Sequence, residues 1–186
     1  MGMPVSPPEP PLSDGVATLR PWEPGDAEAI TAACNDRTIA EFLDQIPSPY
    51  TEADARAFLH MCGEGWRDGT LSNFAITDAD TGDVVGSVGV RWVDPDQGVA
   101  EVGYWLAPGA RGRGICTRAV RLISRWAIDE GAERLQLRAD SLNAASRKVA
   151  VNAGFTEEGV LRSSRYNARL GRRVDFVMYS LLPDEL

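Results

Sequence analysis

A loop rich in glycine and arginine joins an alternating apolar segment to a predicted helix within residues 101–120, "EVGYWLAPGARGRGICTRAV". The N-terminus of a helix presents unpaired backbone N–H groups and the positive end of the helix dipole, and both attract anions. Gly112 and Gly114 let a ligand approach the backbone closely, and Arg111 and Arg113 add positive charge. The loop therefore predicts a site for phosphate or pyrophosphate.

The spacing of this loop does not fit two common nucleotide-binding patterns. A Walker loop needs GxxxxGK[ST], and neither Gly109 nor Gly112 is followed by Gly-Lys at that distance. A dinucleotide fingerprint needs GxGxxG, and Thr117 stands where its third glycine belongs. Coenzyme A, which also carries a pyrophosphate, is the third ligand class to consider.

Cys116 lies inside the same loop and has two interpretations. A helix N-terminus can lower the pKa of a thiol and so prepare a nucleophile. A cysteine nucleophile would also need a base, and the single histidine, His60, belongs to a distant predicted helix. Because cysteine is small, we favour a packing role for Cys116 in the turn.

The composition indicates an ordinary globular protein, with 44% hydrophobic and 25% charged residues in a chain of 186. No apolar run approaches the roughly 20 residues that span a bilayer, so we expect no membrane partner and a cytoplasmic location. The net charge of −8 disfavours nucleic acid as a partner and is compatible with an amine-bearing substrate. Three scattered cysteines and one histidine predict neither disulfides nor a metal site.

The positions of the elements predict one domain. Residues 1–14 hold five prolines and are expected to form a disordered tail before a single domain over residues 15–186. Periodicity and turn signals in that domain predict strands at 16–22, 73–77, 84–92, 99–106, 134–140, 156–166 and 172–182, and helices from 26, at 51–67, at 114–130 and at 143–154. The long helix at 114–130 implies that the strands flanking it are parallel, while close turns make the other pairs antiparallel. The expected fold is α/β of the α+β type, with a mixed, mostly antiparallel sheet and helices on both faces.

Several segments together resemble the GCN5-related N-acetyltransferases. The run from Arg111 to Cys116, "RGRGIC", is similar to the R/Q-x-x-G-x-G/A loop that holds the coenzyme A pyrophosphate in this family. Further similar pieces follow the family order across residues 16–182, namely "LRPWEPGDAEAI", "IPSPYTEADA", "GYWLAP", "NAASRKVAVNAGFTEEGVLR" and "VDFVMYSLL". The "GYWL" strand and the serine of the N-x-x-S helix resemble the RimJ/RimL-like subgroup most.

The resemblance implies direct transfer of an acetyl group from acetyl-CoA to a primary amine, next to a splayed pair of parallel strands. The acceptor would be a protein N-terminus or the amine of a small molecule or antibiotic. A homodimer is considered as a further partner arrangement. Two alternatives stay open: a non-catalytic acyl-CoA-binding module, and a transferase of this fold that uses a different acyl donor.

Residues that match the family motifs are candidates for binding the cofactor. Trp105 and Leu106 would line the pantetheine arm, although a core aromatic is an equally good interpretation of Trp105. Asn143 would bind the arm or the proton-donor region, and it also fits a helix N-cap. The residues assigned to the pyrophosphate loop are Arg111, Gly112, Arg113, Gly114, Cys116 and Thr117.

Ser146 is the candidate proton donor for the departing thiolate. Many family members place a tyrosine four residues after this position, but Ala150 stands there in this chain. A helix serine bonded to a backbone carbonyl is the structural alternative. Glu101 is the candidate base, with Asp140 as the alternative, and the candidate substrate-pocket residues are Glu41, Asp44, Asp140 and Tyr166. The segments at 41–50 and 163–172 should decide between an open groove and a closed pocket.

Overall fold

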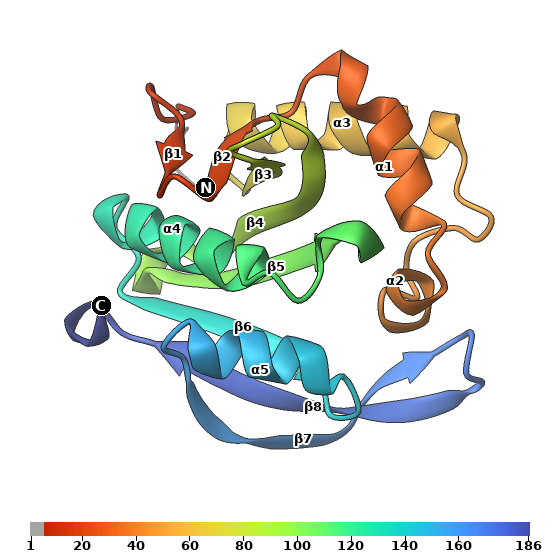
Figure 1. Cartoon of the computed structure of the whole chain (residues 1–186). Coiled ribbons are helices and arrows are strands. Elements are labelled where there is room, and N and C mark those ends of the chain that lie inside the picture. Colours follow the sequence, from red (N-terminus) through yellow and green to blue (C-terminus); the bar gives the residue numbers. More distant parts are fainter. Residues whose placement is uncertain (1–5) are drawn as a thin grey trace.

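The computed structural model describes residues 6–186, and its centre is an eight-stranded sheet in the order β1-β2-β3-β4-β5-β6-β8-β7 (Figure 1). The β5–β6 pair is parallel and the other neighbouring pairs are antiparallel. The strands are β1 Leu12–Ser13, β2 Ala17–Pro21, β3 Leu71–Asp78, β4 Val84–Asp94, β5 Val99–Leu106, β6 Arg134–Asp140, β7 Thr156–Asn167 and β8 Arg172–Leu181. The α-helices are α1 Ala27–Cys34, α2 Arg37–Phe42, α3 Glu52–Asp68, α4 Ile115–Asp129 and α5 Ala144–Asn152.

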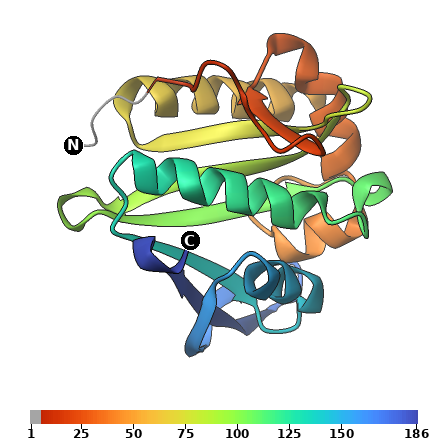
Figure 2. The same ribbon diagram turned by 60° about the vertical axis from the view of Figure 1, so that its left-hand side comes forward.

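Helices cover both faces of the sheet. Helices α4 and α5 lie on one face, and α1 and α3 lie on the other (Figures 1 and 2). Ile115, Ala119 and Ile123 recur on one side of α4 and are fully buried against the strands. Burying an isoleucine side chain of this kind contributes about 1.5–3 kcal/mol, so this stripe fixes α4, and with it the loop before it, on the sheet.

The parallel pair β5–β6 separates partway along its length. The two strands are paired at three positions, the last of which joins Glu101 to Gln136. Beyond that point β5 continues to Leu106 against β4, and β6 continues to Asp140 against β8. The backbone edges of β5 and β6 that face each other are therefore unpaired there. The structure confirms the expected splayed pair and the mixed sheet.

Two elements differ from the sequence prediction. Leu12 and Ser13 form the edge strand β1 within the expected tail, because Leu12 pairs with Leu19 of β2 and Asp14 Oδ2 accepts a 2.8 Å bond from Arg118 of α4. The tail as predicted is therefore too long, and its first five residues lie outside the described part of the chain. The sequence analysis also missed α2, whose N-cap Asp36 accepts a bond from the backbone of Ile39.

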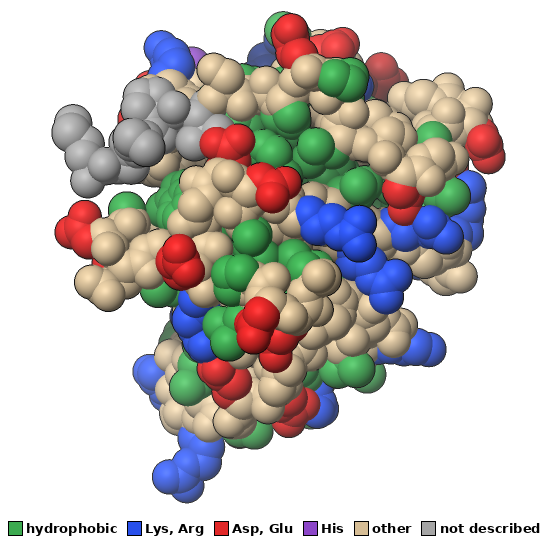
Figure 3. Space-filling model, turned by 90° about the vertical axis from the view of Figure 1, so that its left-hand side faces the viewer, with side chains coloured by type: hydrophobic (Ala, Val, Ile, Leu, Met, Phe, Trp, Pro, Cys, Tyr) green, Lys and Arg blue, Asp and Glu red, His purple; other side chains and the backbone are tan. Residues whose placement is uncertain are grey.

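Charged side chains of both signs are interspersed with apolar ones on the face shown in Figure 3. Within residues 6–186, no helix is both long enough and apolar enough to cross a membrane. The same residues hold no group of three or more His, Cys, Asp or Glu side chains placed to share a metal ion. The cytoplasmic location and the homodimer stay predictions.

Candidate active site

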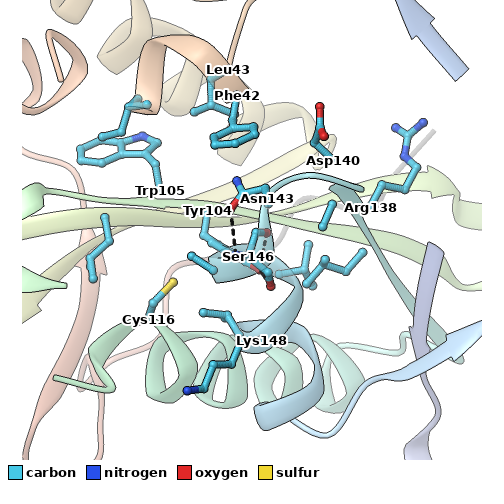
Figure 4. Close-up of a pocket in the computed structure, with 18 of the residues that line it drawn as sticks. Phe42, Leu43, Tyr104, Trp105, Cys116, Arg138, Asp140, Asn143, Ser146 and Lys148 are labelled. Carbon is cyan, nitrogen blue, oxygen red and sulfur yellow. Dashed lines mark hydrogen bonds between the residues drawn. The ribbon is translucent and has the colours of Figure 1, made fainter. Parts of the chain in front are cut away.

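A cavity of about 820 Å³ fills the gap between the separated ends of β5 and β6. Residues 101–106 of β5 and 137–140 of β6 form its two sides. The loop before α4 and the first turns of α4 and α5 line one end, where Figure 4 shows Cys116 and Lys148. Helix α2 and the β7–β8 hairpin line the other end, near Phe42 and Leu43 in the same view. The cavity therefore runs from one face of the sheet toward the other.

The loop before α4 is an open set of backbone donors. Gly112 and Gly114 both have φ of +78°, a left-handed conformation that strains any residue with a Cβ atom. In the described part of the chain, no protein acceptor takes a hydrogen bond from the backbone N–H groups of residues 112–117. Six consecutive free donors at a helix N-terminus form a cradle for an anion such as a pyrophosphate.

The two loop arginines are tied to carboxylates. Arg111 Nη2 lies 2.6 Å from Asp36 Oδ1, and Arg113 Nη2 lies 2.7 Å from Asp78 Oδ2. Arg111 lines the cavity, whereas Arg113 does not. Anion binding by this loop therefore depends on its backbone N–H groups more than on free guanidinium charge. The other predicted cofactor residues all line the cavity: Trp105, Leu106, Gly112, Gly114, Cys116, Thr117, Asn143 and Ser146.

Asn143 and Trp105 each have the structural role that was weighed as an alternative, in addition to lining the cavity. The Asn143 side chain caps α5 by accepting a 3.0 Å bond from the backbone N–H of Ser146. Trp105 stacks on Trp22, with ring centroids 6.4 Å apart, and packs on the core between α1 and α3. Both residues are thus held rigidly at the cavity wall.

Ser146 is paired with a tyrosine that the sequence analysis did not assign. Tyr104 Oη lies 3.0 Å from Ser146 Oγ and 3.0 Å from the Ser146 carbonyl oxygen, which accepts its proton (Figure 4). Burial raises the pKa of Tyr104, so its hydroxyl stays protonated. Tyr104 could have been assigned from the "GYWL" segment. Side chains alternate along a strand, so Tyr104 points to the opposite face of the sheet from Trp105.

Neighbouring side chains use all the hydrogen-bond acceptor positions of the Glu101 carboxylate. Arg138 donates to both carboxylate oxygens, at 2.8 and 3.0 Å. Arg91 donates to Oε1 at 3.1 Å, and Gln136 donates to Oε2 at 3.2 Å. A carboxylate has about four acceptor positions, and these four bonds use them. In this arrangement Glu101 has none left for an incoming ammonium group.

Asp140 is the freer of the two candidate bases. It lies at the end of β6, lines the cavity and is 7% exposed. Its Oδ1 atom accepts a 2.8 Å bond from the backbone N–H of Leu142. Within residues 6–186, no protein donor bonds to its Oδ2 atom. The geometry therefore favours Asp140 over Glu101 as the group that meets an amine.

Cys116 is buried in the wall of the cavity. Burial raises the pKa of its thiol to about 12, so the thiol is uncharged near neutral pH. Ile115 and Cys116 are the first two residues of α4, and both are buried, so they anchor the end of the helix that follows the loop. This environment suits the packing role better than nucleophilic chemistry.

Three of the predicted substrate residues lie outside the cavity lining. Tyr166 is 55% exposed, and the carbonyl of Glu41 accepts a 3.1 Å bond from Asn167. Asp44 forms an ion pair with Arg165, which itself lines the cavity. The segments at 41–50 and 163–172 thus contact each other, and residues of both line this end of the cavity.

A sheet that splits between parallel strands, with an anion cradle at one end of the split, defines a protein that binds a long co-substrate carrying a pyrophosphate. The cradle fits the pyrophosphate of acetyl-CoA, and the unpaired edges of β5 and β6 fit the amide groups of its pantetheine arm. A family model described as "Acetyltransferase (GNAT) domain" matches residues 17–156. The chain therefore belongs to the GNAT acetyltransferase family, and it is an acetyl-CoA-dependent N-acetyltransferase.

Similar proteins cover nearly the whole chain. The uncharacterized N-acetyltransferase p20 of Bacillus licheniformis is 29% identical over 170 residues, 90% of this chain and 93% of p20. YdaF of Bacillus subtilis (strain 168) is 30% identical over 173 residues, 90% of this chain and 92% of YdaF. A structure of RimL, a ribosomal L7/L12 alpha-N-protein acetyltransferase, in complex with coenzyme A has a TM-score of 0.83 at 21% identity, covering 95% of this chain and 98% of RimL. This last likeness shows a shared fold.

Proposed function

We propose that this N-acetyltransferase acts on an uncharged primary amine, with Asp140 as the proton acceptor and the Tyr104–Ser146 pair as the proton donor. The observation that carries the proposal is the position of these groups in the split between β5 and β6. Asp140 lies at the α2 end of the cavity, and Ser146 lies between Asp140 and the anion cradle (Figure 4). A proton acceptor and a proton donor therefore flank one point in the split.

Acetyl-CoA supplies a thioester whose acetyl group moves to the amine. In that transfer the nitrogen–carbon bond forms, the carbon–sulfur bond breaks, and the amine loses one proton while the sulfur gains one. Asp140 Oδ2 has the free acceptor position that the proton leaving the amine needs. The hydroxyl of Ser146 has the proton that the sulfur needs. Tyr104 Oη, 3.0 Å away, can then donate a hydrogen bond to the deprotonated serine oxygen until solvent returns the proton that Asp140 took from the amine.

Glu101 serves in this proposal as a positioning residue. Its bonds to Arg91 and Arg138 join β4 to β6 across β5, at the point where the parallel strands begin to separate. These ion pairs fix the distance between β5 and β6 at the point where the two strands begin to separate. The role of Glu101 as the base stays a prediction, and the four hydrogen bonds to its carboxylate disfavour it.

The first test is calorimetric titration with acetyl-CoA, followed by a screen of primary amines that measures release of the coenzyme A thiol. We expect binding, and amine-dependent thiol release that is lost in the Ser146→Ala variant. Turnover in that variant equal to the parent protein would remove Ser146 from the mechanism. The relative YdaF carries the name putative ribosomal N-acetyltransferase, so peptides with a free N-terminal amine belong in the same screen.

A further inference from the structure

The segment from Asp36 to Asp44, which contains α2, is held at each end by an ion pair. We call this segment the strap. Asp36 pairs with Arg111 of the anion loop at 2.6 Å, and Asp44 pairs with Arg165 of the β7–β8 hairpin at 2.7 Å. The anion loop follows β5, whereas the hairpin belongs to the strands beyond β6. The strap therefore connects the two sides of the split sheet.

The hairpin end of the strap is held by a set of bonds rather than by one ion pair. Asp44 is 7% exposed at its side chain, and its Oδ2 atom also accepts a 3.3 Å bond from the backbone N–H of Ala168. Because this carboxylate is shielded from water, its pair with Arg165 is less screened than a surface pair. The remaining bonds run from Arg165 to Gln45, from Asn167 to the Glu41 carbonyl, and from Arg169 to the carbonyls of Ala40 and Ile46.

The cavity beneath the strap is lined by several apolar side chains. Phe42 and Leu43 of the strap lie between Trp105 and Asp140 in Figure 4, and Phe176 of β8 also lines the cavity. Arg165 and Gln45 reach this end, but they bond to each other and Arg165 also pairs with Asp44. The free Oδ2 atom of Asp140 is thus an acidic acceptor position beside apolar side chains and the hydroxyl residues Thr38 and Ser164, which also line the cavity.

We infer that the strap, closed by the Asp44–Arg165 pair, restricts the acceptor to a compact primary amine with an apolar body. This inference rests on the proposed function, because it places the amine at Asp140. The cavity of about 820 Å³ must hold the pantetheine arm as well as the acceptor, and pockets of roughly 300–1,000 Å³ suit single small ligands. The rest of a peptide chain would have to leave the cavity past the strap, where Arg165 lies bonded to Asp44 and Gln45.

The test compares acceptors in the parent protein and in variants of Arg165. The small amines are 2-phenylethylamine, tyramine and hexylamine, and the peptides are ten-residue chains with a free N-terminal serine, alanine or methionine. The variants are Arg165→Ala, which opens the pair, and Arg165→Lys, which keeps the charge. Arg172→Ala is the matched control, because it removes a positive charge from the same hairpin, and Arg172 forms no ion pair with the described residues.

We expect the parent protein to use the best small amine at least ~10-fold better in kcat/KM than the best peptide. In Arg165→Ala, KM for the small amine should rise ~10-fold with kcat within ~3-fold, and the peptide preference should improve. Arg165→Lys and Arg172→Ala should behave like the parent protein. A KM effect without a kcat effect marks loss of acceptor selection, which general loosening of the fold would not produce.

Two results would overturn the inference: peptides used as well as small amines by the parent protein, or an unchanged preference in a folded Arg165→Ala variant. If acetyl-CoA binds and no small amine of the panel promotes thiol release, the inference also fails. Calorimetry with acetyl-CoA alone separates these results from failure of the proposed function. Absence of acetyl-CoA binding would contradict that function itself, whatever the acceptor.

Discussion

Tyr104 Oη lies 3.0 Å from Ser146 Oγ, and this contact joins the end of β5 to the first turn of α5. The Asn143 cap fixes that turn, and burial keeps the tyrosine protonated. The serine hydroxyl therefore has a fixed position at the cavity and a second hydroxyl behind it. The serine can therefore give its proton to a neighbouring atom while the tyrosine hydroxyl stays protonated and donates a hydrogen bond to the serine oxygen.

Removing either hydroxyl should slow the transfer of the acetyl group. Because proton transfer by a placed side chain contributes roughly 10²–10⁴-fold, we expect Ser146→Ala to lower kcat about 10²-fold and Tyr104→Phe to lower it less. The double variant should resemble Ser146→Ala, since the tyrosine acts through the serine. Steady-state thiol release and calorimetry measure kcat and acetyl-CoA affinity, which should change by less than about 3-fold. Strictly additive losses would contradict a shared proton path.

Two carboxylates, Asp140 and Glu101, should respond differently to conversion to an amide. Asp140→Asn removes the free acceptor position at the cavity, so kcat/KM for the amine should fall about 10²-fold with normal thermal stability. Glu101→Gln loses the ion pairs to two arginines, so it should lower the melting temperature and change kcat by less than about 5-fold. The measurements are amine kinetics and thermal unfolding for both variants. A larger kcat loss in Glu101→Gln than in Asp140→Asn would restore Glu101 as the base.

The anion loop could be predicted from sequence because its signals are local. Gly112 and Gly114 need a left-handed backbone, and the helix after them is amphipathic, so a short window contains the information. The role of Glu101 could not be predicted in this way. Arg91 faces Glu101 through the β4–β5 register, and Arg138 reaches it from β6. These partners are 10 and 37 positions away in the chain, and only the pairing of the strands brings them to one carboxylate.

The same reasoning explains why the sequence could not predict whether the acceptor end is an open groove or a closed pocket. Helix α2 has six residues, too few for a clear apolar period, and its position is set by the pairs from Asp36 to Arg111 and from Asp44 to Arg165. Those pairs span 75 and 121 positions of sequence. The two segments named from the sequence, 41–50 and 163–172, both line this end of the cavity, and contacts between distant residues set how they lie.

The glycines of the anion loop should be needed for their backbone conformation. A Cβ atom at Gly112 or Gly114 would meet no other atom, yet both have φ of +78°. Alanine at either position should therefore cost about 1–2 kcal/mol in unfolding free energy and raise KM for acetyl-CoA severalfold. Gly109→Ala is the matched control, because its added Cβ is equally unobstructed and its φ is not positive. Equal effects at Gly109 and Gly114 would contradict a conformational cause.

The Cys116→Ala variant separates packing from nucleophilic chemistry. Alanine is small enough for the turn and keeps the inward-facing start of α4, so kcat and KM for acetyl-CoA should stay within about 3-fold of the parent protein. The parent thiol, with its pKa raised to about 12 by burial, should react with iodoacetamide at pH 8 far more slowly than in unfolded protein. Loss of turnover in a folded Cys116→Ala variant would return the thiol to the mechanism.

The buried thiols should make the fold sensitive to alkaline pH. Burial raises the pKa from 9.0 to about 11 for Cys34 and to about 12 for Cys62 and Cys116. A raised pKa means that the folded chain keeps protons that the unfolded chain has already lost. The stabilisation is therefore fully present below pH 9 and is lost as the pH rises from about 9 toward about 12.

Denaturant unfolding at pH 8, 9, 10 and 11 measures the fall, which is limited to about 1.4 kcal/mol per pH unit for each thiol. The chain has one lysine, so thiols and tyrosines carry most of the titration in this range. Cys116→Ala should flatten the fall, and an unfolding free energy independent of pH up to 11 would contradict burial of the thiols.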